Sequence, residues 1–406
     1  MLTLFNSLGK RMEAFVPANG SAGVNVFTCG PSVYQRSHIG NYRTFLFEDT
    51  LVRYMDYCGF RVTRGMNFTD IEDKALVEAK KRGTTLRRLT DANIRIFMME
   101  AKKLRMKLPD FLPRASENVD SAAAILQTLL RKKVAYRHGG NIYFDPLRFP
   151  RFGILYGLDM SRWPKKRIRF HKDTYPGMRW NRGDFILWHA CRADDRVCWD
   201  TPVGFGWPAW SIQDPSMIAP LFDETLSVYC GGIDNLVRHH DYSLAILESI
   251  RPYPMAKYWL HCHHLHVDGK KMSKSLGNII YVEMLTNKGF SGQEIRFFLI
   301  DGHYRRRMNY RDHRFRESAE KLRLLRDRVG KIARAGRGES RSRSEAGDTL
   351  EARFRVGMDE DLHVDKAVEN VSAVLAEMAG ARLNRKEAAA LLASLRRIDS
   401  VLQVLF

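Results

Sequence analysis

The chain has 406 residues, 45% of them hydrophobic, and a formal net charge of +20 from 66 Lys and Arg against 46 Asp and Glu. This length suffices for a large core and two to three domains, and the absence of an apolar run of about 18 residues argues against a membrane span. The basic excess favours polyanionic partners such as tRNA or ATP, with a generally basic but unpartnered surface as the alternative.

The six cysteines, at positions 29, 58, 191, 198, 230 and 262, include no Cys-x-x-Cys pair. This pattern favours a reducing compartment over a disulfide scaffold. The first six residues lack the basic-then-apolar layout of a secretory signal. We therefore expect a cytoplasmic protein.

The first part of the chain, residues 1–108, alternates between strand and helix patterns. A strand is expected at Val24–Cys29, and apolar residues at helical spacing follow it as far as Gly59, a typical helix stop. A second strand is predicted within Phe60–Phe68, and a helix with an acidic first turn at Asp70–Arg82. This order predicts the first half of a Rossmann-like α/β nucleotide-binding unit.

Residues 109–205 break the pattern, with a helix near Ser121–Tyr136 and a short strand at Asn141–Phe144. The α/β pattern returns over 206–265, where Leu226–Tyr229 indicates a strand and the stretch from about His239 to Ile250 a helix. Residues 266–310 connect this part to the last one.

The last part, residues 311–406, is predicted to be a helical bundle. Residues 334–348, rich in Arg, Ser, Gly and Glu, are expected to be a linker within it. Two apolar stripes at helical spacing support the bundle: Phe315, Ala319, Leu322, Leu325, Val329 and Ile332, and then Leu391, Leu395, Ile398, Leu402 and Leu405.

Two short stretches, far apart in the chain, carry the strongest functional signal. Ser37–Asn41 opens the first long helix, where unpaired N–H groups and a partial positive charge suit phosphate. Lys271–Ser275 brings two ammonium groups to a loop where charge could build on a departing pyrophosphate. Singly, His38 is as well explained as a helix cap and the lysines as a solvated loop; together they indicate an ATP site.

These two stretches resemble the HIGH and KMSKS signatures of class I aminoacyl-tRNA synthetases. Three further runs, Cys29–Tyr34, Asn67–Lys74 and Gly232–Asp234, resemble the cysteinyl-tRNA synthetases, and the similarity extends over residues 2–405. The resemblance implies a catalytic domain split by an insertion over 109–205, whose end matches Gly177–His189, and followed by a helical bundle. An anticodon-reading domain usually follows such a bundle, and we expect none here.

The resemblance also implies roles for individual residues. A class I enzyme joins an amino-acid carboxylate to the α-phosphate of ATP, with Mg²⁺, and needs alignment and charge compensation rather than a protein nucleophile. Catalytic contacts are then expected from His38, Asn41, Lys271 and Lys274. Nucleotide-binding residues would be Gly40, Gly232, Asp234 and Ser273, and the substrate pocket would include Ser32, Thr69 and Trp210.

The amino-acid pocket departs from the family's pattern. The family typically holds Zn²⁺ with two Cys, one His and one Glu, and the ion selects cysteine by binding its thiolate. Cys29 and His239 match this set, whereas Asp214 stands at the second cysteine and Ser243 at the glutamate.

Three interpretations of this departure are open. Cys29, Asp214 and His239 still hold zinc, since three protein ligands are common in catalytic sites. Alternatively the metal is absent, and Asp214 contacts a polar or cationic part of another substrate. In the third interpretation Cys29 is a small buried hydrophobe and His239 a helix-start residue.

The leading functional hypothesis is ATP-dependent activation of cysteine or a related amino acid, followed by transfer to the acceptor end of a tRNA. An alternative is a tRNA-independent ligase that transfers the adenylated amino acid to a small amine, as the cysteine ligase of mycothiol assembly does. A second alternative is a synthetase-like regulator without activity. The expected partners are thus an amino acid, ATP and a tRNA or small amine; a monomer is favoured over an oligomer.

Overall fold

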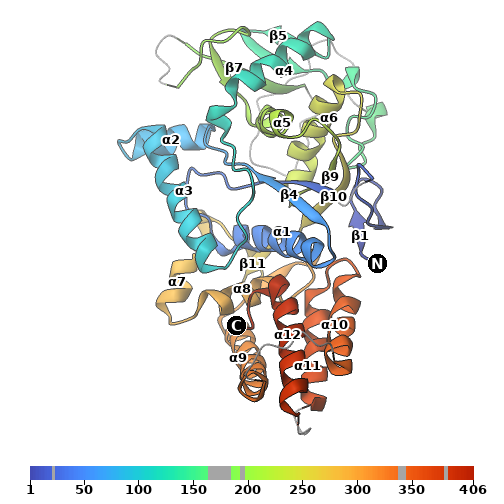
Figure 1. Cartoon of the computed structure of the whole chain (residues 1–406). Helices are drawn as coiled ribbons and strands as arrows, with labels where there is room; N and C mark the ends of the chain where they lie inside the picture. Colours follow the sequence, from blue (N-terminus) through green and yellow to red (C-terminus); the bar gives the residue numbers. More distant parts are fainter. Residues whose placement is uncertain (21–22, 163–183, 193–196, 337–343, 379–382) are drawn as a thin grey trace.

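The computed structural model describes the chain except for residues 21–22, 163–183, 193–196, 337–343 and 379–382. At its centre lies a four-stranded parallel sheet in the order β10-β9-β3-β4 (Figure 1). Its strands are β3 (Gly23–Thr28), β4 (Arg61–Met66), β9 (Leu226–Gly232) and β10 (Ala256–Cys262). Helix α1 (Ile39–Tyr57) links β3 to β4 and helix α6 (Asp241–Ile250) links β9 to β10, as parallel strands require. The predicted Rossmann-like α/β fold is confirmed.

The two faces of this sheet belong to two different cores. Alternation along the strands sends Val26 and Val228 to a core shared with α1 and the C-terminal helices. Phe27 and Tyr229 point to the other face, into a core shared with α4, α5 and α6. Because both faces are covered, the strands are apolar on both sides, which is typical of parallel sheets.

Three antiparallel or mixed sheets surround the central one. An N-terminal hairpin pairs β1 with β2, and a four-stranded sheet within residues 135–208 has the order β5-β6-β7-β8. A third sheet, β12-β11-β13, carries the Lys271 segment. The bounds of these strands are β1 Thr3–Asn6, β2 Arg11–Ala14, β5 Ala135–His138, β6 Asn141–Phe144, β7 Phe185–Ala190, β8 Gly206–Pro208, β11 Leu265–Val267, β12 Lys270–Lys271 and β13 Met308–Tyr310.

Helices cover the sheets and build the C-terminal bundle at the opposite end of the molecule from the sheet that contains β5 and β7 (Figure 1). They are α2 Asp73–Lys81, α3 Leu86–Lys103, α4 Val119–Arg131, α5 Trp210–Leu221, α7 Val282–Asn287, α8 Gly292–Ile300, α9 Asp312–Ala335, α10 Glu345–Met358, α11 Val364–Glu377 and α12 Arg385–Leu402. The six residues of the first predicted stripe are the buried residues of α9, and those of the second are buried in α12 and just after it. The predicted helical bundle is confirmed.

Several predicted element ends were wrong. The helix expected to reach Tyr136 ends at Arg131, because Lys133 takes a left-handed backbone conformation (φ 58°) and Tyr136 lies in β5. The helix expected from Asp70 begins at Asp73, since the Asp70 carboxylate accepts hydrogen bonds from the N–H and hydroxyl of Ser116 instead. Of the predicted linker, residues 337–343 lie outside the described residues, and so do residues 177–183 of the predicted insertion end.

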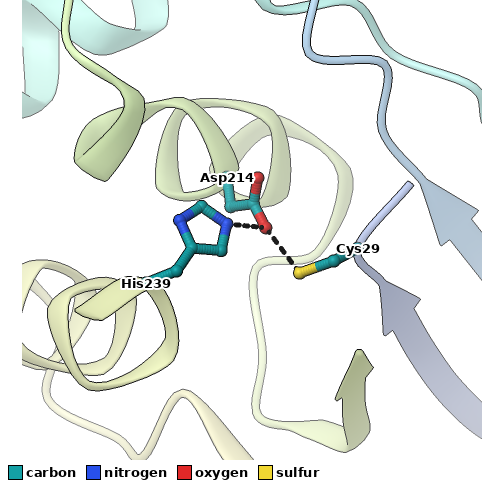
Figure 2. Close-up of side chains that lie close together, drawn as sticks. All are labelled: Cys29, Asp214 and His239. Atoms are coloured by element: carbon teal, nitrogen blue, oxygen red, sulfur yellow. Dashed lines mark hydrogen bonds and ion pairs between the residues drawn. The ribbon is translucent and has the colours of Figure 1, made fainter. Parts of the chain in front are cut away.

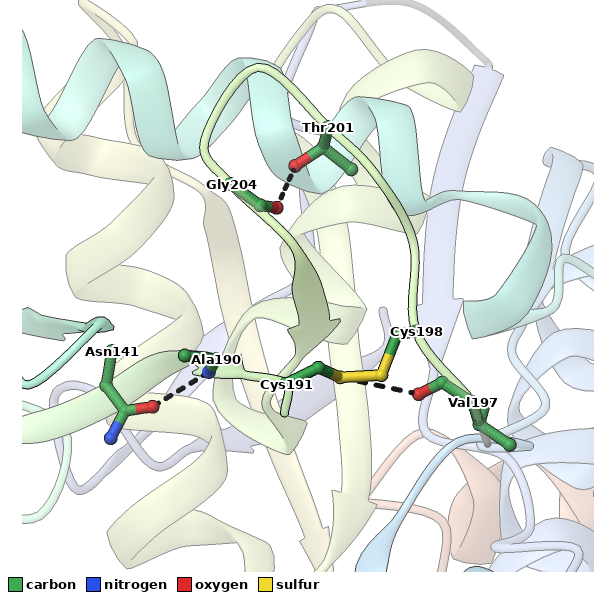
Figure 3. The surroundings of a disulfide bond; sticks show 7 residues. All are labelled: Asn141, Ala190, Cys191, Val197, Cys198, Thr201 and Gly204. Carbon is green, nitrogen blue, oxygen red and sulfur yellow. Dashed lines mark hydrogen bonds between the residues drawn. A yellow bond between two sulfur atoms is a disulfide. The ribbon is translucent and has the colours of Figure 1, made fainter. Parts of the chain in front are cut away.

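One disulfide was not expected from the sequence. Cys191 and Cys198 are bonded, with their Cα atoms 6.3 Å apart (Figure 3). Cys191 follows β7, and Cys198 precedes Trp199, which exchanges backbone hydrogen bonds with Gly206 at the start of β8. The antiparallel return of the chain therefore brings together two cysteines whose spacing matches no recognised motif. Cys29, Cys58, Cys230 and Cys262 are free thiols.

Within the part of the chain that the structure describes, no helix is both long and apolar enough to cross a membrane.

Candidate active site

The candidate residues gather at the carboxyl ends of the parallel strands, where open α/β sheets bind ligands. Cys29 directly follows β3, and Thr69 comes three residues after β4. Gly232 is the last residue of β9, and Asp234 lies two residues beyond it. The sheet thus brings segments from both halves of the catalytic unit to one edge.

His38 is the N-cap of α1. Its ring Nδ1 accepts the backbone N–H of Asn41 (3.3 Å), and the Asn41 side chain accepts the backbone N–H of His38 (3.0 Å) in return. Since Nδ1 is an acceptor, the neutral ring carries its proton on Nε2. Burial lowers the pKa of His38 to about 4, against a smaller opposing effect of Asp234. The ring is therefore a neutral N–H donor at pH 7. His38 can cap the helix through Nδ1 and still contact a phosphate through Nε2.

The Lys271 segment is a short loop closed on itself. Asn278 accepts the backbone N–H of Ser273 (2.9 Å) and donates to the carbonyl of Lys271 (3.3 Å). The Ser273 hydroxyl lies 3.2 Å from that of Ser275, and Lys274 begins the 3₁₀ turn Lys274–Leu276. The Lys271 ammonium is mostly exposed.

This loop lies against the N-terminus of α1. A Cβ placed on Gly40 would lie 2.6 Å from Met272 Cε, so Met272 occupies the space that a side chain at Gly40 would need. Lys271 Nζ lies 3.9 Å from Asp234 Oδ2, and both charges act on His38. The two stretches that are distant in the sequence therefore face each other, with Asp234 beside them.

A second group of predicted residues meets on the other side of β3. One ligand atom each of Cys29, Asp214 and His239 lies within 4.8 Å of the others, and all three residues are buried (Figure 2). Asp214 Oδ2 is 2.9 Å from His239 Nε2 and 3.2 Å from Cys29 Sγ. Asp214 comes from α5, which packs against α6.

Asp214 is the centre of this cluster. Besides His239 and Cys29, the Tyr229 hydroxyl donates to Oδ2 (2.6 Å) and the Asn67 amide to Oδ1 (3.1 Å). Burial raises the pKa of Asp214, but the attraction of His239 and the hydrogen bonds outweigh burial and lower it. Burial raises the pKa of the Cys29 thiol, and the charge of Asp214 raises it further.

A π-helical turn, Leu236–His240, places His239 and its neighbour. The helix expected to start at His239 begins as α6 two residues later. The wider turn directs both His239 and His240 inward: His240 Nε2 lies 3.0 Å from Cys29 Sγ, and its Nδ1 lies 2.8 Å from His261 Nε2. Such π-helical segments are frequent at functional sites.

The remaining predicted pocket residues border this cluster. The Trp210 ring stacks on the His239 ring with centroids 4.0 Å apart. Ser32 and Thr69 pair through their backbones, and Thr69 Oγ1 accepts from Asn67. Ser243 is fully buried one turn after His239, and its hydroxyl has no hydrogen-bond partner among the residues described.

Tyr229, Asn67 and His240 also contact the cluster, although sequence reasoning gave them no role. Asn67 is the first residue of the Asn67–Lys74 run, so the sequence did contain a signal for its place near the site. The part played by Tyr229 depends on which face of β9 its side chain takes, and alternation from Val228 would have given that. Nothing in the sequence marks the π-helical turn that turns His240 inward.

The donor atoms of the cluster fit a zinc ion. Thiolate, imidazole and carboxylate are all accepted zinc ligands, and three protein ligands leave one position open. Over the described ranges this is the one group of Cys, His and acidic residues close enough to share a metal. A drawback is that His239 Nδ1 has no hydrogen-bond acceptor there, whereas metal-bound histidines usually donate through the second nitrogen.

Comparison with known proteins places these observations in context. Residues 15–320 match the family described as tRNA synthetases class I (C) catalytic domain. A curated protein named cysteine–tRNA ligase from Chlamydia muridarum is 34% identical over the full chain, which covers 88% of its length. A cysteine–tRNA ligase from Protochlamydia amoebophila is 32% identical over the full chain and 86% of its own length.

Solved structures support the same fold. The methionyl-tRNA synthetase of Mycobacterium tuberculosis, in complex with methionyl-adenylate, superimposes with a TM-score of 0.64 at 14% identity over 94% of this chain and 90% of that one. A putative arginyl-tRNA synthetase from Campylobacter jejuni gives 0.62 at 12% identity, over 94% and 92% of the two chains.

Proposed function

The chain belongs to the class I tRNA synthetases of the cysteine type, and we propose that it activates cysteine with ATP and transfers it to a tRNA. The observation that carries this proposal is the contact between Met272 and Gly40, which closes the Lys271 loop over the N-terminus of α1. An ATP site assembled from these two stretches requires that they lie side by side, which this contact supports. The curated relatives named above are cysteine–tRNA ligases, which favours a tRNA acceptor over a small amine and argues against an inactive regulator.

The first step joins the amino acid to AMP. A carboxylate oxygen of the amino acid attacks the α-phosphorus of ATP, and the bond from that phosphorus to the bridging oxygen of pyrophosphate breaks. Negative charge develops on the phosphate oxygens, so fixed N–H donors and ammonium groups lower the barrier. His38 would donate from Nε2, Lys271 and Lys274 would offset the charge of the departing pyrophosphate, and Asn41 would hold His38 in place.

The nucleoside would lie between the end of β9 and α1. Gly232 leaves room for it, and the half-exposed Asp234 carboxylate could accept from its hydroxyl groups. Gly40 and Ser273 would line the phosphate side, where Mg²⁺ would accompany ATP. In the second step a ribose hydroxyl at the tRNA 3′ end attacks the activated carbonyl and AMP leaves.

The amino-acid side chain would lie at Cys29, Asp214 and His239, beside Trp210, Ser32 and Thr69. Cys29, Asp214 and His239 would hold zinc. When bound, zinc is a Lewis acid that prefers the sulfur of cysteine to the oxygen of serine, so it would distinguish the two amino acids. The protein's own part is to desolvate the cluster and to fix Asp214 through Tyr229 and Asn67.

ATP–pyrophosphate exchange, scanned over the amino acids, tests the proposed function. We expect exchange with cysteine and attachment of cysteine to tRNA. Exchange without attachment to any tRNA would mean a small-amine ligase, and the absence of exchange with every amino acid would contradict the proposal.

The metal is tested separately. Protein produced with added zinc should contain about one zinc per chain, and a double substitution Cys29→Ala with His239→Ala should abolish binding because one carboxylate cannot hold the ion. A zinc-free wild type that still activates cysteine would exclude the metal and leave Asp214 as the direct substrate contact.

A further inference from the structure

A cavity of about 230 Å³ opens beside the Cys29–Asp214–His239 cluster. Its walls come from the start of α2, from strands β7 and β8, and from the start of α5 and α6, and they include Glu72, Phe185, His189, Trp207, Trp210 and Tyr242. Trp210 belongs to both places, since its ring also stacks on His239. The cavity therefore adjoins the position proposed for the amino-acid side chain, on the side of β7 and β8.

Glu72 is the unusual residue in this wall. It is only 9% exposed, and its Oε1 atom has no hydrogen-bond partner in the described part of the chain. Burial raises the pKa of Glu72 to about 7, although Lys74 and a hydrogen bond from the Ser32 hydroxyl oppose the rise. A buried carboxyl oxygen without a donor costs free energy, so its retention calls for a partner that arrives with a ligand.

The local structure fixes Glu72 relative to the cluster. Ser32 is near enough to Glu72 to lower the pKa of its carboxyl group, and Ser32 is three residues beyond Cys29. Ser32 pairs with Thr69, whose backbone carbonyl accepts from the N–H of Val33 (3.0 Å) and whose N–H donates to the carbonyl of Pro31 (3.2 Å). Glu72 and Cys29 are thus carried by paired loops at adjacent strand ends, and α2 begins directly after Glu72.

An amino-acid substrate has one polar group that this site has not yet accommodated. Its carboxylate must face the α-phosphate of ATP near His38, and its side chain lies at the cluster. The α-ammonium remains, and it must be desolvated next to Trp210. A buried carboxylate with a free oxygen matches that group in charge and in hydrogen bonding.

We propose that Glu72 accepts a hydrogen bond from the α-ammonium group of the substrate amino acid and so determines specificity for α-amino acids. This inference rests on the proposed function, because it takes the amino acid to bind at the cluster.

The test combines a change in the protein with a change in the ligand. Binding of L-cysteine and of 3-mercaptopropionate, which lacks the α-amino group, is measured by calorimetry on wild type and Glu72→Gln. In the wild type, cysteine should bind more tightly than 3-mercaptopropionate. Glu72→Gln should weaken cysteine binding about 10- to 100-fold, as expected for a hydrogen bond between charged groups, and leave 3-mercaptopropionate nearly unchanged.

Asp73→Asn is the matched control. Asp73 is the next residue, borders the same cavity and is exposed. The substitution Asp73→Asn therefore removes one negative charge and leaves the buried Glu72 carboxylate in place. It should leave both affinities within about twofold of the wild type, since an exposed charge is screened. Glu72→Asp, with the charge kept on a shorter side chain, should restore part of the affinity for cysteine.

Two results would overturn the inference. One is an equal loss of affinity for both ligands in Glu72→Gln, because this would indicate a damaged pocket. The other is unchanged cysteine binding combined with impaired transfer to tRNA, because this would assign the cavity to the acceptor end. Failure of the proposed function appears differently, as wild-type protein that binds cysteine but exchanges no pyrophosphate.

Discussion

The histidines beside the site are kept neutral by burial, and this determines what they can do. The pKa of His38 is lowered to about 4 and that of His261 to about 3, in each case chiefly by loss of solvent. A neutral His38 with Nδ1 bonded to Asn41 can donate only from Nε2. Activation by such a donor should not depend on a histidine that gains or loses its proton near pH 6.5.

Burial of His261 predicts acid-dependent stability. An unfolded histidine titrates near 6.5, whereas folded His261 binds a proton only near 3, so the unfolded state gains protons first as the pH falls. This contribution to stability is complete above pH 6.5 and is lost below it, by up to about 1.4 kcal/mol per pH unit. Urea unfolding at pH 7.5, 6.0 and 5.0 should give a smaller loss for His261→Gln than for the wild type.

Buried carboxyl groups with raised pKa values have the opposite effect on stability from His261 as the pH falls. Glu48, with a pKa raised to about 8 by burial, binds its proton more readily in the folded state and stabilises the fold as the pH falls. Because Glu48 is present in both proteins, its effect cancels in the comparison. Identical pH slopes for the two proteins would refute the assignment to His261.

Lys271 provides a prediction about the transition state. Lys271→Ala should slow pyrophosphate exchange by about 10²- to 10³-fold with the KM for cysteine unchanged, because the ammonium acts mainly on charge that develops during the reaction. Lys270→Ala is the control, since consecutive residues of β12 point to opposite faces and both lysines are exposed. A comparable loss of rate in both variants would reduce the effect to general electrostatics.

At the scale of elements, the N-terminus of α1 couples helix geometry to the Lys271 loop. Gly40→Ala adds a methyl group that would meet Met272 Cε at 2.6 Å and the His38 ring at 3.1 Å. The Met272 side chain is flexible, so it should move while the backbone stays in place. Alanine also favours the helix over glycine by up to about 1 kcal/mol. We expect an unchanged or higher melting temperature with exchange about 10- to 100-fold slower.

A double-mutant cycle identifies the cause of that loss. Adding Met272→Ala to Gly40→Ala should restore part of the exchange rate, because it removes the atom that the new methyl group displaces. Met272→Ala alone gives the cost of losing a buried methionine. Strictly additive losses would show that the two stretches do not interact through this contact.

The elements with local signals were predictable from the sequence, and those set by distant contacts were not. Asn141–Phe144 is the strand expected, and the α9 stripe is the buried face expected, because period and turn residues are local. The meeting of Cys29, Asp214 and His239 was also foreseen, but through family resemblance rather than pattern. The π-helical turn at Leu236–His240, the Cys191–Cys198 bond and the unpaired oxygen of Glu72 all depend on packing between segments far apart in the chain.

At the scale of the whole molecule, α1 connects the catalytic sheet with the C-terminal helices. One core extends from Val26 and Val228 through α1 to Phe315 and Leu395 without interruption. The helix that presents His38 at one end therefore packs against α8 and α12. Loosening of the bundle should be felt at the N-terminus of α1.

A buried ion pair fastens this connection. Arg296 of α8 and Asp49 of α1 are both fully buried, with Nη2 and Oδ2 2.6 Å apart. Arg296 also donates to the carbonyls of Leu402 in α12 (2.7 Å) and Leu104 (3.1 Å). Burial alone would raise the pKa of Asp49, but the positive charges of Arg296 and Arg53 outweigh the effect of burial. The pKa of Asp49 is therefore lowered, and the carboxylate stays charged. One guanidinium thus joins the catalytic domain to the last helix.

Arg296→Met should therefore destabilise the whole protein rather than one part. Removing one partner of a buried pair typically costs about 3–5 kcal/mol, and the lower end is expected here because Arg53, 2.9 Å from Asp49, compensates part of its charge. Arg323→Met is the control: its bond to Glu294 is similar in length (2.7 Å), but the arginine is 55% exposed, so a loss of at most about 1 kcal/mol is expected. The free energy of unfolding in urea measures both.

Asp49→Asn combined with Arg296→Met decides whether the pair acts as a unit. Once the guanidinium is gone, neutralising the carboxylate removes a buried charge, so the double variant should be more stable than the sum of the two single losses implies. Arg53 should moderate this coupling, because its Nε also lies 2.9 Å from Asp49 Oδ2. If the losses simply add, Arg296 stabilises the fold through its carbonyl contacts to α12, and the bundle is held by those bonds rather than by the charge on α1.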